Sequence, residues 1–160
     1  MCHNGCMTPQ EIEATIREYI PQILHMSLAT SVDNKPWVCE VHFSYDDELN
    51  LYFRSTPDRR HCQEIQQNPN VAGNIVTQHF KNQLIRGIYF EGKAEQLDEV
   101  DENHPAYKAV EARYGKASTI QAADDPSVAR YYKISVSNWY VFDAYTSTPP
   151  QKYQLPWKEQ

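Results

Sequence analysis

The sequence contains no apolar run that approaches the roughly 20 residues needed to span a bilayer, and no signal-peptide pattern precedes its first expected helix. We therefore expect a cytoplasmic protein with no membrane partner. Positive charge is also scarce, since 15 lysines and arginines stand against 21 acidic residues and leave a net charge of −6. Because binding to a phosphate backbone rests on accumulated Lys and Arg, this balance argues against a nucleic-acid partner.

Common nucleotide and metal motifs are missing as well. Neither the phosphate-loop pattern GxxxxGK nor the dinucleotide fingerprint GxGxxG occurs, so a nucleotide must be held in another way. The acidic residues Glu91, Asp124 and Asp125 show no metal-ligand spacing. No serine–histidine–acid arrangement can be argued from the order of the residues, so the catalytic residues remain unassigned.

Cysteine is present at four positions, which are 2, 6, 39 and 62. Their spacing favours reduced thiols over disulfides. Cys39, on an expected strand, and Cys62, in an expected helix, are interpreted as small buried hydrophobic side chains. Cys2, His3 and Cys6 could hold zinc or close a small loop, but a frayed terminus is the commoner fate of such a segment, and we predict no metal site.

Three helices are expected. Thr8 and Glu11 form a capping box with Pro9 at the first helical position, and apolar residues continue at helical spacing, which predicts a helix over 8–24 with a bend at Pro21. Asp58 is the expected N-cap of a short helix over 59–67. A third helix is predicted over 105–114 and ends at Gly115.

Period-two alternation predicts the strands. Their expected ranges are His25 to Val32, Trp37 to Tyr45, Leu49 to Arg54, Val71 to Thr77, Ile85 to Leu97 and Tyr131 to Tyr145. Gly87 and Gly92 lie where a bulge or bend is expected. Several short strands with few helices indicate a mainly β (α+β) barrel, because closing the sheet removes exposed edges. One domain is expected over 1–160, with the barrel over about 25–97 and 131–145 and a tail over 146–160.

One segment combines hydroxyl groups with basic side chains at a helix start. Ser55 and Thr56 follow a strand, and Arg59, Arg60 and His61 open the next helix. The unpaired N–H groups and the dipole of a helix start favour a phosphate or another small anion. Without further information, a capped surface helix with solvated arginines explains the same residues. The sequence therefore offers an anion site as a hypothesis.

Ordered motifs across the chain carry a family resemblance. They are Met26-Ser27-Leu28-Ala29-Thr30, Pro36-Trp37-Val38, Tyr52-Phe53-Arg54-Ser55, Arg59-Arg60-His61, Asn68-Pro69-Asn70-Val71-Ala72 and Phe90-Glu91-Gly92-Lys93-Ala94. In this succession the chain resembles the pyridoxamine-phosphate-oxidase-like FMN-binding split barrels. Two further segments, Leu84 to Gly87 and Leu155 to Trp157, are similar to the uncharacterised YhbP-like branch.

The resemblance implies a six- to seven-stranded antiparallel split β-barrel with flanking helices, a homodimer, and FMN-dependent oxidoreduction of an unknown small substrate or a nicotinamide donor. It places the FMN phosphate at Ser55, Thr56, Arg60 and His61. It places the flavin ring along the strand residues Trp37, Val38, Cys39, Glu40 and Val41. Gln78 and His79 fall where relatives reach across the dimer to the partner's flavin, and Lys152 and Trp157 could cover the site in the same fashion.

The chain also departs from the family pattern. His61 replaces a lysine, and because a histidine is only partly charged at neutral pH, FMN binding should weaken as pH rises. Val38 and Phe43 stand where the oxidase has basic residues, which argues against the vitamin B6 oxidase reaction.

Two other classes of protein stay open. One is a protein that binds flavin or haem without turnover, with four histidines as candidate axial ligands, His25, His42, His61 and His79. The other is a cofactor-free dimeric scaffold. His42 could also be a proton donor near the flavin or an interface residue.

Overall fold

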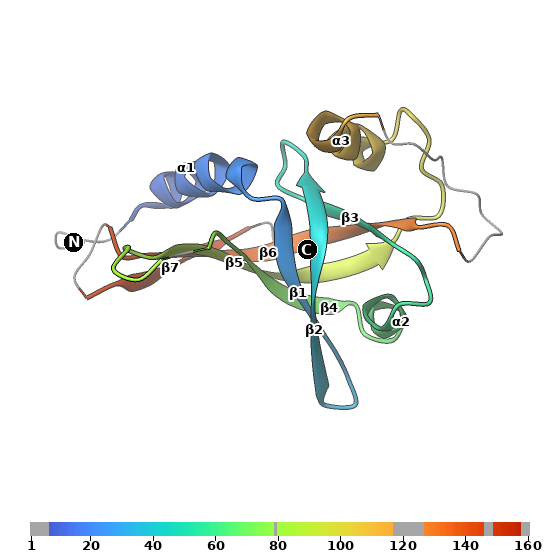
Figure 1. The fold of residues 1–160 in the computed structure, drawn as a ribbon, viewed down its shortest axis with the longest axis horizontal. Helices are drawn as coiled ribbons and strands as arrows, with labels where there is room; N and C mark the ends of the chain where they lie inside the picture. Colours follow the sequence, from blue (N-terminus) through green and yellow to red (C-terminus); the bar gives the residue numbers. More distant parts are fainter. Residues whose placement is uncertain (1–6, 79, 117–126, 146–148, 158–160) are drawn as a thin grey trace.

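The computed structural model describes residues 7–78, 80–116, 127–145 and 149–157, and Figure 1 shows its arrangement. Three α-helices and a short 3₁₀ helix accompany seven strands. The helices are α1 (Pro9–Tyr19), η1 (Ile20–Gln22), α2 (Arg60–Gln67) and α3 (Pro105–Tyr114). The strands are β1 (His25–Val32), β2 (Lys35–Tyr45), β3 (Leu51–Ser55), β4 (Asn70–Val76), β5 (Arg86–Gln96), β6 (Arg130–Asp143) and β7 (Gln151–Pro156).

The strands form one antiparallel sheet that closes on itself. Its order is β3-β2-β1-β4-β5-β6-β7, and an additional pairing between β3 and β6 joins six of the strands into a ring. β6 is long enough to serve three neighbours, because its first half pairs with β3 and its second half with β7, while β5 runs along the other edge. This confirms the predicted split barrel with flanking helices.

The C-terminal region differs from the prediction. Residues 146–160 were expected to form a tail, but residues 151–156 form the strand β7. Tyr153 and Leu155 are buried and pair with Val141 and Trp139 of β6. Two buried residues on a short segment that ends in proline predict a strand only weakly. The strand β7 is stabilised by its pairing with β6.

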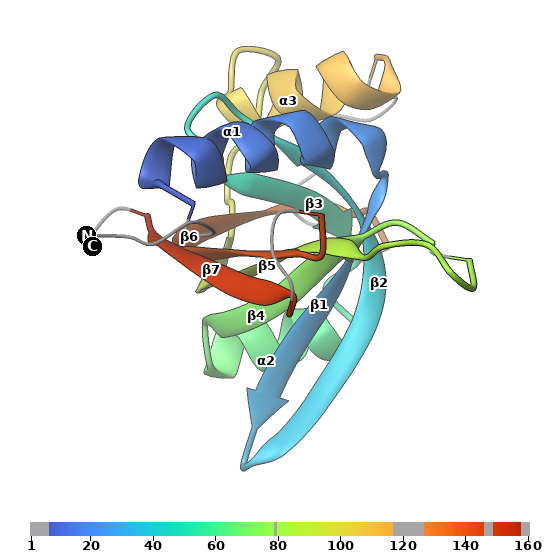
Figure 2. The same cartoon turned by 90° about the vertical axis from the view of Figure 1, so that its left-hand side faces the viewer.

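A tight hairpin connects β1 to β2. Asp33 and Asn34 have φ angles of 52° and 58°, the left-handed pair that a two-residue hairpin turn requires. This turn fixes the register, so Val41 of β2 points inward while Glu40 and His42 are exposed. The β1–β2 hairpin projects beyond the rest of the sheet, and α2 packs beside it (Figures 1 and 2).

The first helix begins as the sequence predicts. The Thr8 hydroxyl accepts a hydrogen bond from the Glu11 N–H, and the Glu11 carboxylate accepts one from the Thr8 N–H at 2.7 Å. The α-helix ends at Tyr19, earlier than expected, and continues as the 3₁₀ turn that contains Pro21. Its buried face rests on the main core, which fills the barrel.

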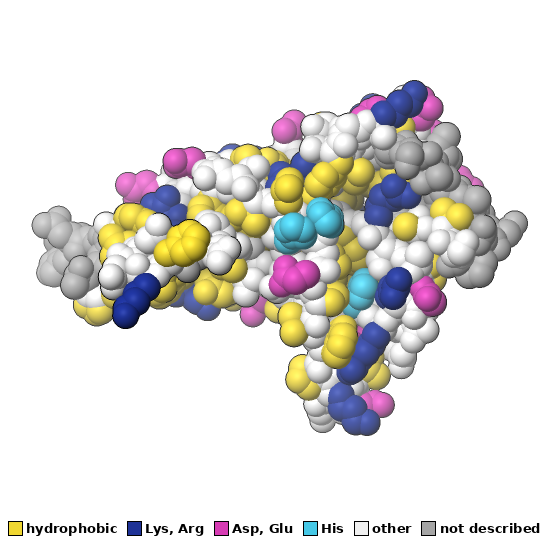
Figure 3. Space-filling view, in the orientation of Figure 1, with side chains coloured by type: hydrophobic (Ala, Val, Ile, Leu, Met, Phe, Trp, Pro, Cys, Tyr) yellow, Lys and Arg dark blue, Asp and Glu magenta, His cyan; other side chains and the backbone are white. Residues whose placement is uncertain are grey.

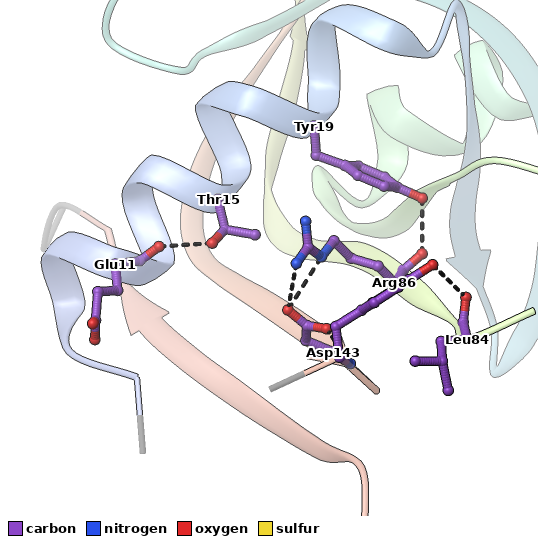
Figure 4. A network of polar contacts seen from close by, with 7 residues as sticks. Glu11, Thr15, Tyr19, Leu84, Arg86 and Asp143 are labelled. Atoms are coloured by element: carbon purple, nitrogen blue, oxygen red, sulfur yellow. Dashed lines mark hydrogen bonds and ion pairs between the residues drawn. The ribbon is translucent and has the colours of Figure 1, made fainter. Parts of the chain in front are cut away.

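A polar network ties α1 to the start of β5 and, through it, to β6 (Figure 4). The Tyr19 hydroxyl accepts from the Thr77 N–H and donates to the Arg86 carbonyl at 2.8 Å. Arg86 in turn pairs with the fully buried carboxylate of Asp143 at 2.8 Å. These bonds fix both ends of the connection that carries Gln78.

The long strand β5 carries the predicted irregularity at Gly92. Its register against β6 shifts between Glu91 and Gly92, and a Cβ on Gly92 would lie 2.3 Å from the Ser135 carbonyl oxygen. Only glycine fits such a close approach of two backbones. Gly87 pairs regularly with Phe142, so β5 has no bulge there.

Candidate functional site

The site predicted around residues 55–61 is built by the connection from β3 to α2. β3 ends at Ser55, and the Arg59 N–H donates to the Thr56 carbonyl at 3.1 Å, which closes the turn. The N-cap of α2 is Arg59, so the assignment of Asp58 as N-cap was wrong. The turn places Asp58 one residue too early for its carboxylate to serve the first helical N–H groups.

The start of α2 has no side-chain cap. In contrast, the N-cap residues Thr8 of α1 and His104 of α3 each accept a hydrogen bond from their own helix. Uncapped N–H groups and the helix dipole give the α2 start a partial positive charge. This arrangement is suited to an oxyanion.

His61 is the second residue of α2, and only 8% of its surface is exposed. Its Nε2 is 2.9 Å from the Ser55 hydroxyl, which brings two of the predicted phosphate residues together. Burial, and then the charge of Arg59, lower the pKa of His61 below its usual value. His61 therefore carries less charge at neutral pH than an ordinary histidine when no anion is bound.

Arg60 links α2 to the hairpin. Its Nε donates to the Glu64 carboxylate at 2.7 Å, and its guanidinium lies over the Trp37 ring at 4.4 Å from the centroid. Glu64 also accepts a hydrogen bond from Thr30 of β1, and this bond, with that from Arg60, lowers the pKa of the Glu64 carboxyl. Sequence reasoning missed Glu64 and Thr30, although the spacing of Arg60 and Glu64 by four residues indicates a helical ion pair.

The predicted ring-binding residues of β2 alternate between two faces. Trp37 and Val38 near the hairpin turn are 40% and 59% exposed, which leaves apolar surface open beside Arg60. Cys39 is half-buried, and burial raises the pKa of its thiol to about 11, so it stays protonated. Val41 is buried, and it can offer a ligand only its backbone.

Gln78 is placed away from the α2 start. With Ser27, Glu40 and Asn74 it lines a hollow of about 460 Å³ between β1, β2 and β4. The Ser27 hydroxyl donates to the Glu40 carboxylate within this hollow. The structure thus places Glu40 and Gln78 in one hollow, and it pairs Ser55 with His61 and Arg60 with Trp37.

Six other predicted residues lie outside the described part of the chain or away from the α2 start. Cys2, His3, Cys6 and His79 are among the residues that the structure does not describe. Lys152 lies over the Tyr89 ring at 4.4 Å. Trp157 packs against the main core and donates through Nε1 to the Glu48 carbonyl, as a packing tryptophan does.

A cavity of about 310 Å³ lies where α3 ends against β2 and β3. Its lining includes His42, Ser44 and Arg54 from the strands and Tyr114 and Lys116 from the helix end. The Ser44 hydroxyl is fully buried and has no hydrogen-bond partner among the described residues. The sequence could not indicate this cavity, because nothing local shows that α3 packs on β2.

The described residues form neither a metal-binding cluster nor a membrane-spanning helix. Within the described ranges, no three His, Cys, Asp or Glu side chains are grouped to hold a metal ion. In the same ranges, no helix is long and apolar enough to cross a membrane. The thiols of Cys39 and Cys62 are both free.

Comparison with known sequences gives one family and one relative. The profile of the family described as pyridoxamine 5'-phosphate oxidase matches residues 12–143. A UPF0306 protein of Photorhabdus laumondii is 29% identical over 84 residues, which is 52% of this chain and 59% of that protein. The matched part therefore spans about three fifths of this relative's length.

Solved structures share the fold at low sequence identity. A haem-binding protein from Mycobacterium smegmatis matches with a TM-score of 0.70 and 17% identity, covering 94% of this chain and 59% of that chain. An FAD-binding protein from Mesorhizobium loti matches with a TM-score of 0.62 and 16% identity, covering 81% and 90%. At this identity the likeness concerns the fold alone.

Proposed function

The chain belongs to the pyridoxamine 5'-phosphate oxidase family, and from this premise we propose that it is an FMN-binding oxidoreductase of the split-barrel type. The start of α2 would hold the flavin phosphate through Ser55, Thr56, Arg60 and His61. The ring would lie along Trp37 to Val41. The bound flavin would supply the hydride chemistry, and the protein would supply orientation and electrostatics.

The contact between Arg60 and Trp37 is the observation that carries this proposal. It joins the two parts of the site, which lie on separate elements, at a distance of 4.4 Å. The bond to Glu64 uses Nε of Arg60 and leaves the two terminal nitrogens for a phosphate. Together with the uncapped N–H groups of α2, these donors match the planar, multidentate recognition that phosphate favours.

The basic residues of the vitamin B6 oxidase have no counterpart here. Phe43 is fully buried in the barrel core and apolar, so it offers a ligand no charge. Val38 is exposed but apolar. The substrate we propose is therefore a different small molecule or a nicotinamide donor, and the cavity lined by Ser44, Arg54 and Tyr114 offers polar groups to receive part of it.

We also propose a homodimer. The connection between β4 and β5 exposes Phe80, Leu84 and Ile85, and the hairpin exposes Trp37 and Val38. Exposed apolar side chains of this size favour association. Light scattering of the purified protein at micromolar concentration should give twice the 18.6 kDa of one chain. A mass of one chain would contradict the dimer.

Haem binding without turnover is the second candidate, favoured by the exposed histidines His25 and His42. Parallel titrations with FMN and with haemin, followed by flavin fluorescence and by the haem Soret band, separate the two. Saturable FMN binding, with reduction of the bound flavin by NADH or NADPH, supports the oxidoreductase. Haem binding alone would favour the second candidate, and binding of neither would favour a cofactor-free scaffold.

A further inference from the structure

Two histidine side chains lie side by side on the face of the molecule shown in Figure 3. The pairing of β1 with β2 places His25 directly opposite His42. Their ring centroids are 4.2 Å apart, with 55° between the ring planes, and both side chains are exposed. The proposed phosphate site uses neither ring.

The position of this pair in the ladder brings the two rings together. The Phe43 N–H donates to the Leu24 carbonyl at 3.3 Å, so the hydrogen bond lies beside the His25–His42 pair and not within it. In an antiparallel sheet such non-hydrogen-bonded pairs have the shorter Cα separation and the closer side chains. The backbone therefore holds both imidazoles over one point of the surface.

Helix α3 reinforces this arrangement from the side. The Tyr114 hydroxyl is 3.0 Å from the Leu24 carbonyl oxygen and 2.6 Å from that of Phe43, which are the two backbone groups next to the histidines. The Tyr114 ring also meets His42 edge-on, with 5.9 Å between the ring centroids. A pair that is anchored before binding loses less conformational freedom when a ligand arrives.

The chemistry of the pair suits a transition-metal ion. Neutral imidazole is a common ligand of zinc, copper and nickel. Glu40 is exposed on the same face of β2, two residues from His42, and adds negative charge near the rings. We propose that His25 and His42 form a two-histidine site for a divalent transition-metal ion such as Zn²⁺, with water in the remaining coordination positions.

A competition titration tests this proposal. Zn²⁺ is shared between the protein and a chromophoric chelator, for the unmodified chain and for the variants His25→Gln and His42→Gln. Each variant should lose one equivalent of bound Zn²⁺, with affinity at this site about 100-fold weaker, because one ligand of a chelating pair is gone. Zn²⁺ held by Cys2, His3 and Cys6 would contribute equally to all three proteins and cancels in the difference.

His104→Asn is the matched control. Asparagine can cap α3 as His104 does, so this variant removes one imidazole and should keep the full Zn²⁺ stoichiometry. In the unmodified protein, the imidazole NMR signals of His25 and His42 should shift together on addition of one equivalent. Unchanged stoichiometry and affinity in both histidine variants, or signals that do not shift together, would overturn the metal site. Neither result depends on FMN binding.

Discussion

The starts of α1 and α2 are two solutions to one problem. Each helix begins with N–H groups that have no partner within the helix. At α1 the chain satisfies them itself, through the reciprocal bonds of Thr8 and Glu11. At α2 the N-cap Arg59 provides no such bond, and positive side chains accumulate instead. A helix start that is closed by its own residues has a structural role, whereas an open and cationic one is available for a ligand.

The same contrast holds for an ion pair in each helix. Arg17 pairs with Glu13, and Arg60 pairs with Glu64, both across four residues of helix. Both arginines are partly exposed, and Arg17 also donates to the Asp47 carbonyl, whereas Arg60 is stacked on Trp37 and its partner is bonded to Thr30. The α2 pair is therefore part of a connected group, which can position a guanidinium for binding.

The largest expected effect comes from Arg60→Ala. It should weaken FMN binding by about 10- to 100-fold, because charge-assisted hydrogen bonds to a phosphate contribute about 1.5–3 kcal/mol. Fluorescence titration measures the affinity. Arg17→Ala is the control, since it removes an equivalent helical ion pair, and it should leave FMN affinity unchanged. Equal losses in both variants would contradict the assignment.

Closing the open helix start is the next test. Arg59→Asp places a good N-cap side chain at a residue whose backbone is already extended, at φ −70° and ψ 142°. The free energy of unfolding should rise by about 1 kcal/mol, while FMN affinity should fall about tenfold as the carboxylate repels the phosphate. Urea unfolding and FMN titration measure the two quantities. A stabilised variant with unaltered FMN affinity would show that the α2 start does not bind the FMN phosphate.

Opening the closed helix start should have a smaller and purely structural effect. Thr8→Ala removes the cap of α1 and should lower the free energy of unfolding by about 1 kcal/mol. FMN affinity should not change. Thr8→Ser, which keeps the hydroxyl, should retain most of the stability in the same urea experiment. A loss of FMN affinity in Thr8→Ala would show that the two helix starts are not independent.

The smallest effect is the pH dependence that His61 imposes. Because burial lowers its pKa, the unfolded chain binds the proton more readily, so the stability that His61 contributes is present above about pH 6.5 and is lost as pH falls through the lowered pKa. His61→Gln should reduce this loss in urea unfolding followed from neutral to acidic pH. An unchanged pH slope would contradict the assignment.

FMN should reverse the effect at this residue. A phosphate beside His61 favours its charged form, so binding takes up a proton and FMN affinity should fall as pH rises from about 6 to 8. His61→Gln should flatten that profile in the fluorescence titration. A profile with the same slope in both proteins would show that His61 does not bind the phosphate.

Features that depend on neighbouring residues in the chain were predicted from the sequence, whereas features that depend on distant residues were missed. The capping box at Thr8 and the helix end at Gly115 are local, and each was predicted correctly. The strand β7 was missed because it depends on β6, and Asp58 was misplaced by one residue because the turn geometry decides the cap. Only the three-dimensional register pairs His25 with His42.

The candidate site also has a part that the sequence predicts and a part that only the fold reveals. Ser55, Arg60 and His61 could be named together because they are neighbours in the chain and the family motif includes them. The contact of Arg60 with Trp37 and the role of Glu64 could not be read from spacing alone, because α2 must first pack against β1 and β2. Burial of His61, which decides its charge, is a property of the fold.

The most direct test of the open helix start compares FMN with riboflavin, which lacks the phosphate. In the unmodified protein FMN should bind at least about tenfold more tightly than riboflavin, since the phosphate meets charge-assisted donors. In Arg60→Ala this preference should largely disappear, while riboflavin affinity stays the same. Equal affinity for the two flavins in the unmodified protein, or a preference that survives Arg60→Ala, would contradict the account.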